Sequence, residues 1–177
     1  YGDWSSDVCS SDLNGTVYLA SELIDGGTLE DWLTNLGRLP SQVELDRIAE
    51  VMLDALTKVH NAGLVHRNVS PDCILIRRED GLPLLTDLGT TTVVTDYITA
   101  PLAVRGYSAI EVYSPDETLA GPWTDVYGMG AVLYRAIVGQ APPVATERAL
   151  TGKMLSVLSA AKKGYRISFL KAIRSEE

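Results

Sequence analysis

Residues 64–76 read LVHRNVSPDCILI, and residues 86–89 read TDLG. A short apolar run, 73–77, begins at the end of the first stretch, and a second, 82–86, leads into the start of the other. The turn signal Asp80-Gly81 lies between the two runs. Runs of β-branched and apolar residues on either side of Asp-Gly are typical of a β-hairpin. The pattern therefore predicts a hairpin whose two strands bring the polar stretches before and after it to one place in the fold.

Two helices upstream of this hairpin begin with the same capping pattern. Thr28 is followed three residues later by Asp31, and Ser41 is followed in the same way by Glu44, so each pair can form a reciprocal capping box. Apolar residues then recur at helical spacing, which assigns one face of each helix to the core. We expect helices near 28–36, 42–60, 124–138 and 147–162.

The two polar stretches resemble the catalytic loop and the metal-binding loop of protein kinases, whose patterns are H-R-D-x-x-x-x-N and D-F-G. His66 and Arg67 match the first pattern, and Asp87 matches the aspartate of the second. Asn68 stands where the family has its catalytic aspartate, and Cys73 stands where it has a magnesium-binding asparagine. Two of the three groups that the family uses for chemistry are therefore replaced.

Further motifs extend the resemblance over about residues 16–143. Residues 106–111, GYSAIE, resemble the A-P-E end of an activation segment, with Ile110 in place of proline. Residues 124–130, TDVYGMG, resemble the D-V-Y-S-x-G helix, whose aspartate, here Asp125, anchors the backbone of the catalytic loop in the family. The sequence around these motifs resembles that of bacterial Ser/Thr kinases. The resemblance implies an α+β fold, namely the protein-kinase-like C-terminal lobe, which is mostly helical with a small β-hairpin at the active-site edge.

The resemblance also implies a set of site residues and cofactors. Residues 17–24 are strand-like and resemble the last strand of the kinase N-lobe running into the hinge, where Glu22 and Ile24 would offer backbone groups to adenine. ATP and magnesium are the cofactors of the parent family. The expected residues are His66, Arg67, Asn68 and Ser70 for catalysis, Glu22, Ile24 and Leu75 for the cofactor, and Asp87 and Cys73 for the metal.

The substitutions bear directly on phosphoryl transfer. A carboxylate can accept the proton of the substrate hydroxyl, whereas the amide of Asn68 can orient that hydroxyl but cannot take its proton. Cys73 offers a soft sulfur, whereas magnesium prefers hard oxygen ligands. Ser70 replaces a lysine common in Ser/Thr kinases, although bacterial members commonly carry serine there. We therefore expect a pseudokinase or inactive fragment, with weak or absent nucleotide binding.

Two alternatives remain open. The first is an active Ser/Thr protein kinase that transfers the γ-phosphoryl of ATP to protein hydroxyls, with Asn68 only orienting the hydroxyl. The second is an active kinase gene with read errors at these codons. A single base change converts an aspartate codon to asparagine, but asparagine to cysteine needs more than one. Read errors alone are therefore the least economical explanation.

The two ends of the chain differ in character from its middle. Residues 1–13 and 174–177 are similar to translations of a common sequencing-library adaptor, and we expect residues 1–13 to be disordered. Residues 14–173 would then be the hinge plus C-lobe of a kinase-like domain, truncated at both ends. On this interpretation Glu111 has lost the arginine that normally pairs with it.

Composition excludes several other classes of function. The 177 residues carry a formal net charge of −8, which argues against nucleic acid as a partner. No apolar run is long enough to span a bilayer, and Cys73 is left without a second cysteine outside the adaptor-like tract, so neither a disulfide framework nor a zinc site is expected. We expect a cytoplasmic domain whose partners are a protein substrate or a regulatory protein.

Overall fold

A computed structural model describes residues 9–13, 16–20, 22–87, 92–93, 103–116, 119–154, 156–159 and 164–175. The helices are α1 (Leu29–Asn35), α2 (Gln42–Asn61), α3 (Pro122–Val138), α4 (Ala145–Thr151) and α5 (Ile167–Ser175). The strands are β1 (Cys9–Leu13), β2 (Thr16–Ala20), β3 (Gly26–Thr28), β4 (Leu64–Val65), β5 (Ile74–Arg77), β6 (Pro83–Leu85) and β7 (Thr92–Val93). Short 3-10 turns include η1 (Pro71–Cys73) and η3 (Ile110–Tyr113).

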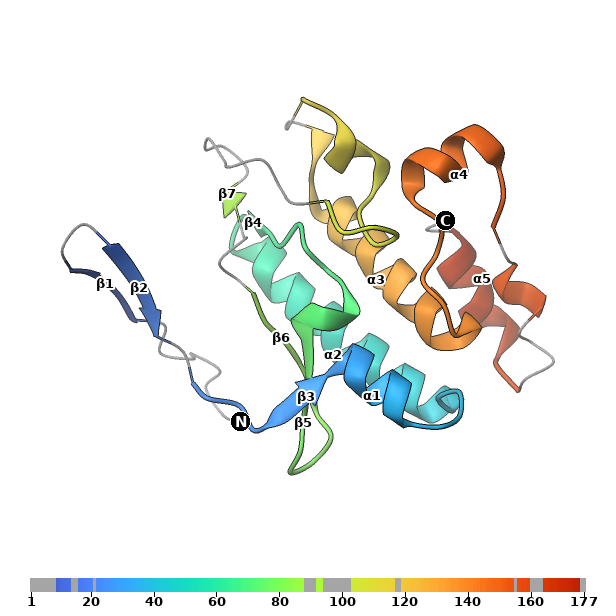
Figure 1. The fold of residues 1–177 in the computed structure, drawn as a ribbon, viewed down its shortest axis with the longest axis horizontal. Helices are drawn as coiled ribbons and strands as arrows, with labels where there is room; N and C mark the ends of the chain where they lie inside the picture. The colour runs from blue at the N-terminus through green and yellow to red at the C-terminus, as the bar shows by residue number, and fades with distance from the viewer. Residues whose placement is uncertain are drawn as a thin grey trace.

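The core lies between α2 and α3, which run side by side through the middle of the molecule, with α5 packed against α3 (Figure 1). Apolar side chains at helical spacing face each other across this contact, and burying each one contributes about 1.5–3 kcal/mol. Six of them are no more than 2% exposed: Leu45, Met52 and Leu56 of α2, and Met129, Val132 and Ile137 of α3. The predictions of helices near 42–60 and 124–138 are confirmed, although α3 begins two residues earlier.

Local capping explains where α1 and α2 begin. The Asp31 N–H donates to Thr28 Oγ1 at 3.0 Å and the Thr28 N–H donates back to the Asp31 carboxylate at 3.3 Å. The Glu44 N–H donates to Ser41 Oγ at 3.4 Å, while the Ser41 N–H donates to Glu44 Oε2 at 2.7 Å. Both capping boxes are therefore confirmed.

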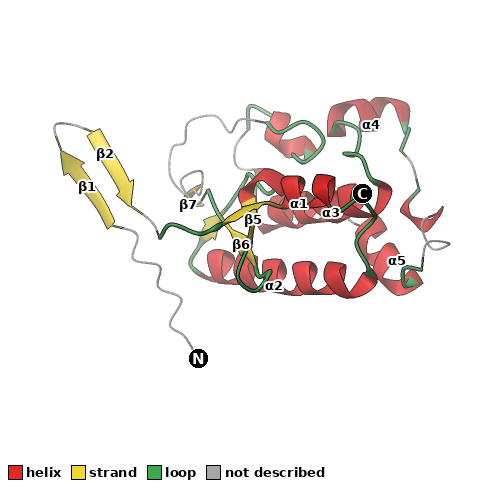
Figure 2. Ribbon diagram, turned by 60° about the horizontal axis from the view of Figure 1, so that its bottom comes forward, coloured by secondary structure: helices red, strands yellow, loops and turns green. Residues whose placement is uncertain are grey.

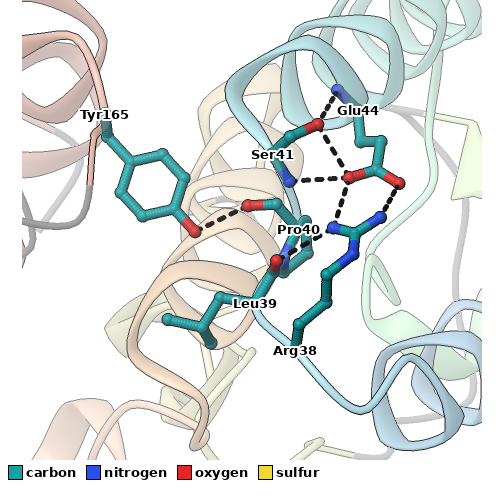
Figure 3. A network of polar contacts seen from close by, with 6 residues as sticks. All are labelled: Arg38, Leu39, Pro40, Ser41, Glu44 and Tyr165. Atoms are coloured by element: carbon teal, nitrogen blue, oxygen red, sulfur yellow. Dashed lines mark hydrogen bonds and ion pairs between the residues drawn. The ribbon is translucent and has the colours of Figure 1, made fainter.

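A further network ties the segment before α5 to the turn before α2 (Figure 3). Glu44 accepts two hydrogen bonds from the Arg38 guanidinium, each at 2.8 Å. The Tyr165 hydroxyl donates to the carbonyl of Pro40 at 2.7 Å. This turn is thereby held from both sides, which fixes how α5 approaches the helical core.

The small sheet has the strand order β3-β5-β6. β5 pairs antiparallel with β6, with Ile74 opposite Leu85, so the predicted hairpin is confirmed. β3 pairs with the other edge of β5, a strand that the sequence analysis did not predict. A Cβ at Gly26 would lie 2.4 Å from the carbonyl oxygen of Ile76, so only glycine allows the two backbones to approach this closely.

The structure corrects several predictions downstream and at the ends. The helix predicted over 147–162 is wrong beyond Thr151, because Gly152 takes the left-handed conformation (φ 61°) and ends α4. Residues 157–159 form a 3-10 turn, and residues 155 and 160–162 lie outside the description. α5 was not predicted, and it runs into the tract assigned to an adaptor.

The N-terminal segment also differs from the expectation. β1 pairs antiparallel with β2, so the prediction of disorder is wrong for Cys9–Leu13, while residues 1–8 lie outside the description. This hairpin stands apart from the helical body in both views (Figures 1 and 2). The predicted strand over 17–24 ends at Ala20, and residues 22–25 form no regular element. None of the helices in the described ranges is long and apolar enough to cross a bilayer.

Candidate functional site

The loop that carries His66, Arg67 and Asn68 is anchored by one carboxylate from α3. Asp125 Oδ2 accepts the His66 backbone N–H at 2.8 Å, and Asp125 Oδ1 accepts the Arg67 backbone N–H at 2.7 Å. His60 Nε2, at the end of α2, lies 2.8 Å from Oδ2. Asp125 is 1% exposed, so the backbone N–H groups of the loop, and not water, provide hydrogen bonds to its buried carboxylate. The expectation that Asp125 anchors this loop is confirmed.

The ring of His66 joins this loop to the segment that leads into Asp87. Its Nδ1 accepts the Asn68 backbone N–H at 3.3 Å, so the ring proton lies on Nε2. Nε2 then donates to the carbonyl of Thr86 at 2.7 Å. The structure therefore brings the two predicted loops together at one site, as the hairpin pattern indicated.

Two residues of this site have left-handed backbone conformations. Arg67 has φ 66° and Asp87 has φ 62°. Such conformations cost about 1–3 kcal/mol for residues other than glycine and gather at functional sites, where the surrounding contacts enforce them. At Arg67 the enforcing contact is the hydrogen bond from its N–H to Asp125.

The thiol of Cys73 contacts two other residues of the loop. The thiol donates to the backbone carbonyl of Asn68, and Ser70 Oγ lies 3.1 Å from the sulfur. Burial raises the pKa of the Cys73 thiol, and the nearby carboxylates of Asp87 and Asp72 raise it further, although hydrogen bonds from Ser70 oppose the shift. The thiol therefore stays protonated at neutral pH, and its proton is engaged within the protein.

The donor set does not fit the magnesium site of the parent family. Magnesium requires hard oxygen ligands, and Asp87 supplies a carboxylate at the exposed edge of the site, but Cys73 supplies a buried protonated sulfur. Within the described residues no group of three or more His, Cys, Asp or Glu side chains could hold a metal ion. Leu88 and Gly89, the rest of the metal-binding motif, lie outside the description.

The side chain of Asn68 contributes one buried acceptor to this loop. Its side-chain Oδ1 is buried and has no hydrogen-bond partner among the described residues. A buried amide oxygen without a partner costs about 1–3 kcal/mol. This oxygen therefore lacks the hydrogen bond that a buried acceptor normally has.

The predicted adenine contacts come from the segment before β3 and from β5. Glu22 is exposed and Ile24 is half-buried. The segment is held to the sheet because the Arg78 N–H donates to the carbonyl of Asp25 at 2.9 Å. Leu75 lies in β5 opposite Leu84 of β6. Sheet pairing thus brings this segment and β5 together, and their contact with adenine stays a prediction.

Two functional contacts were missed by sequence reasoning. The loss of an arginine partner was predicted for Glu111, but not that its carboxylate accepts a hydrogen bond from the Thr124 hydroxyl at 2.7 Å. Thr124 Oγ1 also accepts the Gly121 N–H at 3.1 Å, which places Thr124 in the first turn of α3, next to Asp125. His60 was also missed. Its only sequence signal is a basic residue in the last turn of a helix.

Comparisons with known proteins agree with this geometry. A family model for the protein kinase domain matches residues 6–169. The serine/threonine-protein kinase PknA of Mycobacterium tuberculosis is 36% identical over 156 residues, which covers 84% of this chain and 35% of PknA. PknL of the same species is 36% identical over 129 residues, covering 71% of this chain and 31% of PknL. The chain therefore spans about a third of the length of these curated relatives.

A solved structure described as "PpkA-294 apo form" is similar in fold, with a TM-score of 0.78 and 27% sequence identity. The match covers 96% of this chain and 59% of that one. The fold, the anchored loop and the sequence relatives point to the same conclusion. This chain belongs to the protein kinase family, as a bacterial serine/threonine kinase-like domain.

Proposed function

We propose that this domain is a pseudokinase: it keeps the loop architecture of a Ser/Thr kinase C-lobe and acts through contacts with a protein substrate or regulatory protein, without transferring phosphate. The observation that carries the proposal is the state of Cys73. Its thiol is buried, protonated and committed to the Asn68 carbonyl, at the position where the family places a metal-binding asparagine. A site that lacks this oxygen ligand neutralises the phosphates of a nucleotide poorly.

Asn68 supports the same proposal. The side chain at this position must accept the proton of the attacking hydroxyl, and an amide has no basic lone pair for that purpose. Positioned general-base catalysis contributes about 10²–10⁴-fold to such reactions. Phosphoryl transfer depends on a base that accepts the hydroxyl proton and on metal ions that neutralise the phosphates, and these two substitutions remove the base and one metal ligand.

The remaining parts of a nucleotide site define what this domain can bind. Glu22, Ile24 and Leu75 are the proposed adenine contacts, and Asp87 is the remaining acidic ligand. We propose weak or absent binding of ATP and magnesium by this chain. The formal net charge of −8 disfavours nucleic acid as an alternative partner, and we propose a cytoplasmic location.

A second candidate is an active Ser/Thr kinase, and one observation favours it. The buried Asn68 Oδ1, without a partner among the described residues, could accept and orient a substrate hydroxyl. The loop that carries it is anchored by Asp125 through the backbone N–H groups of His66 and Arg67. In this case the hydroxyl proton must pass to the transferred phosphoryl group or to water. Resequencing the gene across codons 68 and 73 separates both candidates from a read error.

The test compares the complete 177-residue chain with its Asp87→Asn variant. Each is incubated with radiolabelled ATP, millimolar magnesium and a generic Ser/Thr protein substrate. We expect incorporation by the wild-type chain to equal that of Asp87→Asn, which lacks the last acidic ligand. Incorporation that depends on Asp87 and exceeds the variant reproducibly would overturn the proposal in favour of the active kinase.

A further inference from the structure

The proton positions around Cys73 follow from the chemistry of the three groups involved. The carbonyl of Asn68 can only accept a hydrogen bond, so the single thiol proton of Cys73 points toward it. The sulfur then has no proton left for Ser70. Ser70 must therefore donate its hydroxyl proton to the sulfur across the 3.1 Å contact. The direction of both hydrogen bonds is fixed.

We propose that Cys73 is a positioning residue that holds the catalytic loop through an ordered relay, from the Ser70 hydroxyl to the Cys73 thiol to the Asn68 carbonyl. The relay makes the order of this loop independent of a divalent cation. It deepens the proposed function, because it explains how a domain that lacks the metal-binding asparagine retains the loop geometry of a kinase.

The surroundings of the relay keep water away from it. Ser70 is 3% exposed and Cys73 is 1% exposed. The Cys73 N–H also donates to the Ser70 carbonyl at 3.2 Å, which closes the η1 turn and sets the distance between the two side chains. A hydrogen bond in such a dry setting is not exchanged for one with solvent.

The backbone of Cys73 connects the relay to the second loop. Its carbonyl accepts both the Thr86 N–H at 2.9 Å and the Thr86 hydroxyl at 3.0 Å. The carbonyl of Thr86 in turn accepts from His66 Nε2 at 2.7 Å. Cys73 therefore lies where the loop of His66 and Asn68 meets the segment before Asp87, and displacement of its side chain would loosen both.

The S–H stretching band in the infrared tests the relay directly, because other protein groups do not absorb in that region. The sequence has two cysteines, so a Cys9→Ser background leaves Cys73 as the only thiol. We expect the band of the folded protein to lie at lower frequency than that of the same protein in denaturant. Ser70→Ala should shift it, and millimolar magnesium should leave it unchanged. A folded-state band at the unfolded frequency, or one that moves with magnesium, would overturn the proposal.

A second measurement uses the conservative variant as a rescue. Cys73→Ser keeps a donor for the Asn68 carbonyl, whereas Cys73→Ala removes it. We expect amide hydrogen exchange in peptides covering 66–70 to rise about five-fold in Cys73→Ala and to stay near the wild-type rate in Cys73→Ser. Equal exchange in the two variants would contradict the relay. Neither measurement uses ATP, so their failure is distinguishable from failure of the proposed pseudokinase function.

Discussion

The carboxylate of Asp125, in the first turn of α3, accepts the backbone N–H of Arg67 at 2.7 Å. Arg67 adopts a left-handed conformation there, and the same carboxylate accepts the N–H of His66. One buried side chain of a core helix therefore fixes the backbone of the loop that carries Asn68. The helical core thus helps to set the geometry of the site, which persists although two of its chemical groups differ from those of active kinases.

Replacing this carboxylate should weaken the whole domain. Asp125→Asn puts an amide NH₂ group opposite backbone donors and removes a buried charge that accepts hydrogen bonds. We expect a loss of about 3 kcal/mol in the free energy of unfolding, measured by urea denaturation. The matched control is Asp54→Asn, whose ion pair with Lys58 is exposed and should contribute less than about 0.5 kcal/mol. Equal losses in the two variants would contradict the anchoring role.

The contact between α3 and the catalytic loop also depends on a glycine. A Cβ added at Gly128 would lie 2.8 Å from the carbonyl oxygen of Val69 and 2.9 Å from its Cβ. Helix propensity alone favours alanine over glycine by about 1 kcal/mol. We expect Gly128→Ala instead to destabilise the protein by about 1–3 kcal/mol, because the loop backbone must move. A gain in thermal stability of Gly128→Ala would contradict the close contact between the loop backbone at Val69 and α3.

The link between η3 and α3 rests on the hydroxyl of Thr124. Thr124→Val has the same shape but leaves the Glu111 carboxylate and the Gly121 N–H without this partner. We expect a loss of about 1–3 kcal/mol in the free energy of unfolding. Thr124→Ser keeps the hydroxyl and should recover most of that loss. Similar stability of the valine and serine variants would mean that this hydroxyl contributes little.

Because of the Arg38–Glu44 pair, we expect the free energy of unfolding to depend on pH in the acidic range. The hydrogen bonds from Arg38 lower the pKa of Glu44 from an ordinary value of 4.5 to about 2, against the opposing effect of burial. A folded-state pKa below the unfolded value means that the stabilisation is present above about pH 4.5 and is lost as the pH falls toward 2.

Both side chains are partly exposed, so solvent screening limits the contribution to about 1 kcal/mol. We expect Glu44→Gln to be less stable than wild type by about this amount at pH 7, and the difference to shrink by pH 2.5 in urea titrations. A difference that stays constant between these pH values would contradict the assigned pKa.

Local signals in the sequence predicted much of the fold. Two of these signals are the capping boxes at Thr28 and Ser41, and a third is the Asp80-Gly81 turn. Each involves residues within a few positions of each other, so whether it forms depends little on the rest of the chain. The end of α4 at Gly152 was misjudged because an apolar pattern was extended through a residue that takes a left-handed conformation.

Contacts between distant segments could not be read in the same way. β3 consists of three residues, and its pairing with β5 depends on a close approach that only Gly26 permits. The bond between Glu111 and Thr124 requires the position of η3 against α3. Sequence reasoning identified Cys73 as a replaced metal ligand, but the hydrogen bond of its thiol to the Asn68 carbonyl depends on the folded loop.

The most direct test of the account is restoration of the two replaced groups in the complete product of the gene that encodes this chain. Asn68→Asp should recover some phosphotransfer, Cys73→Asn should recover less, and the double variant should exceed the product of the two single effects, because base and metal act on one transition state. Phosphate incorporation into a generic substrate measures all four proteins. We expect background activity for wild type and strong activity for the double variant. Wild-type activity equal to that of the double variant would contradict it.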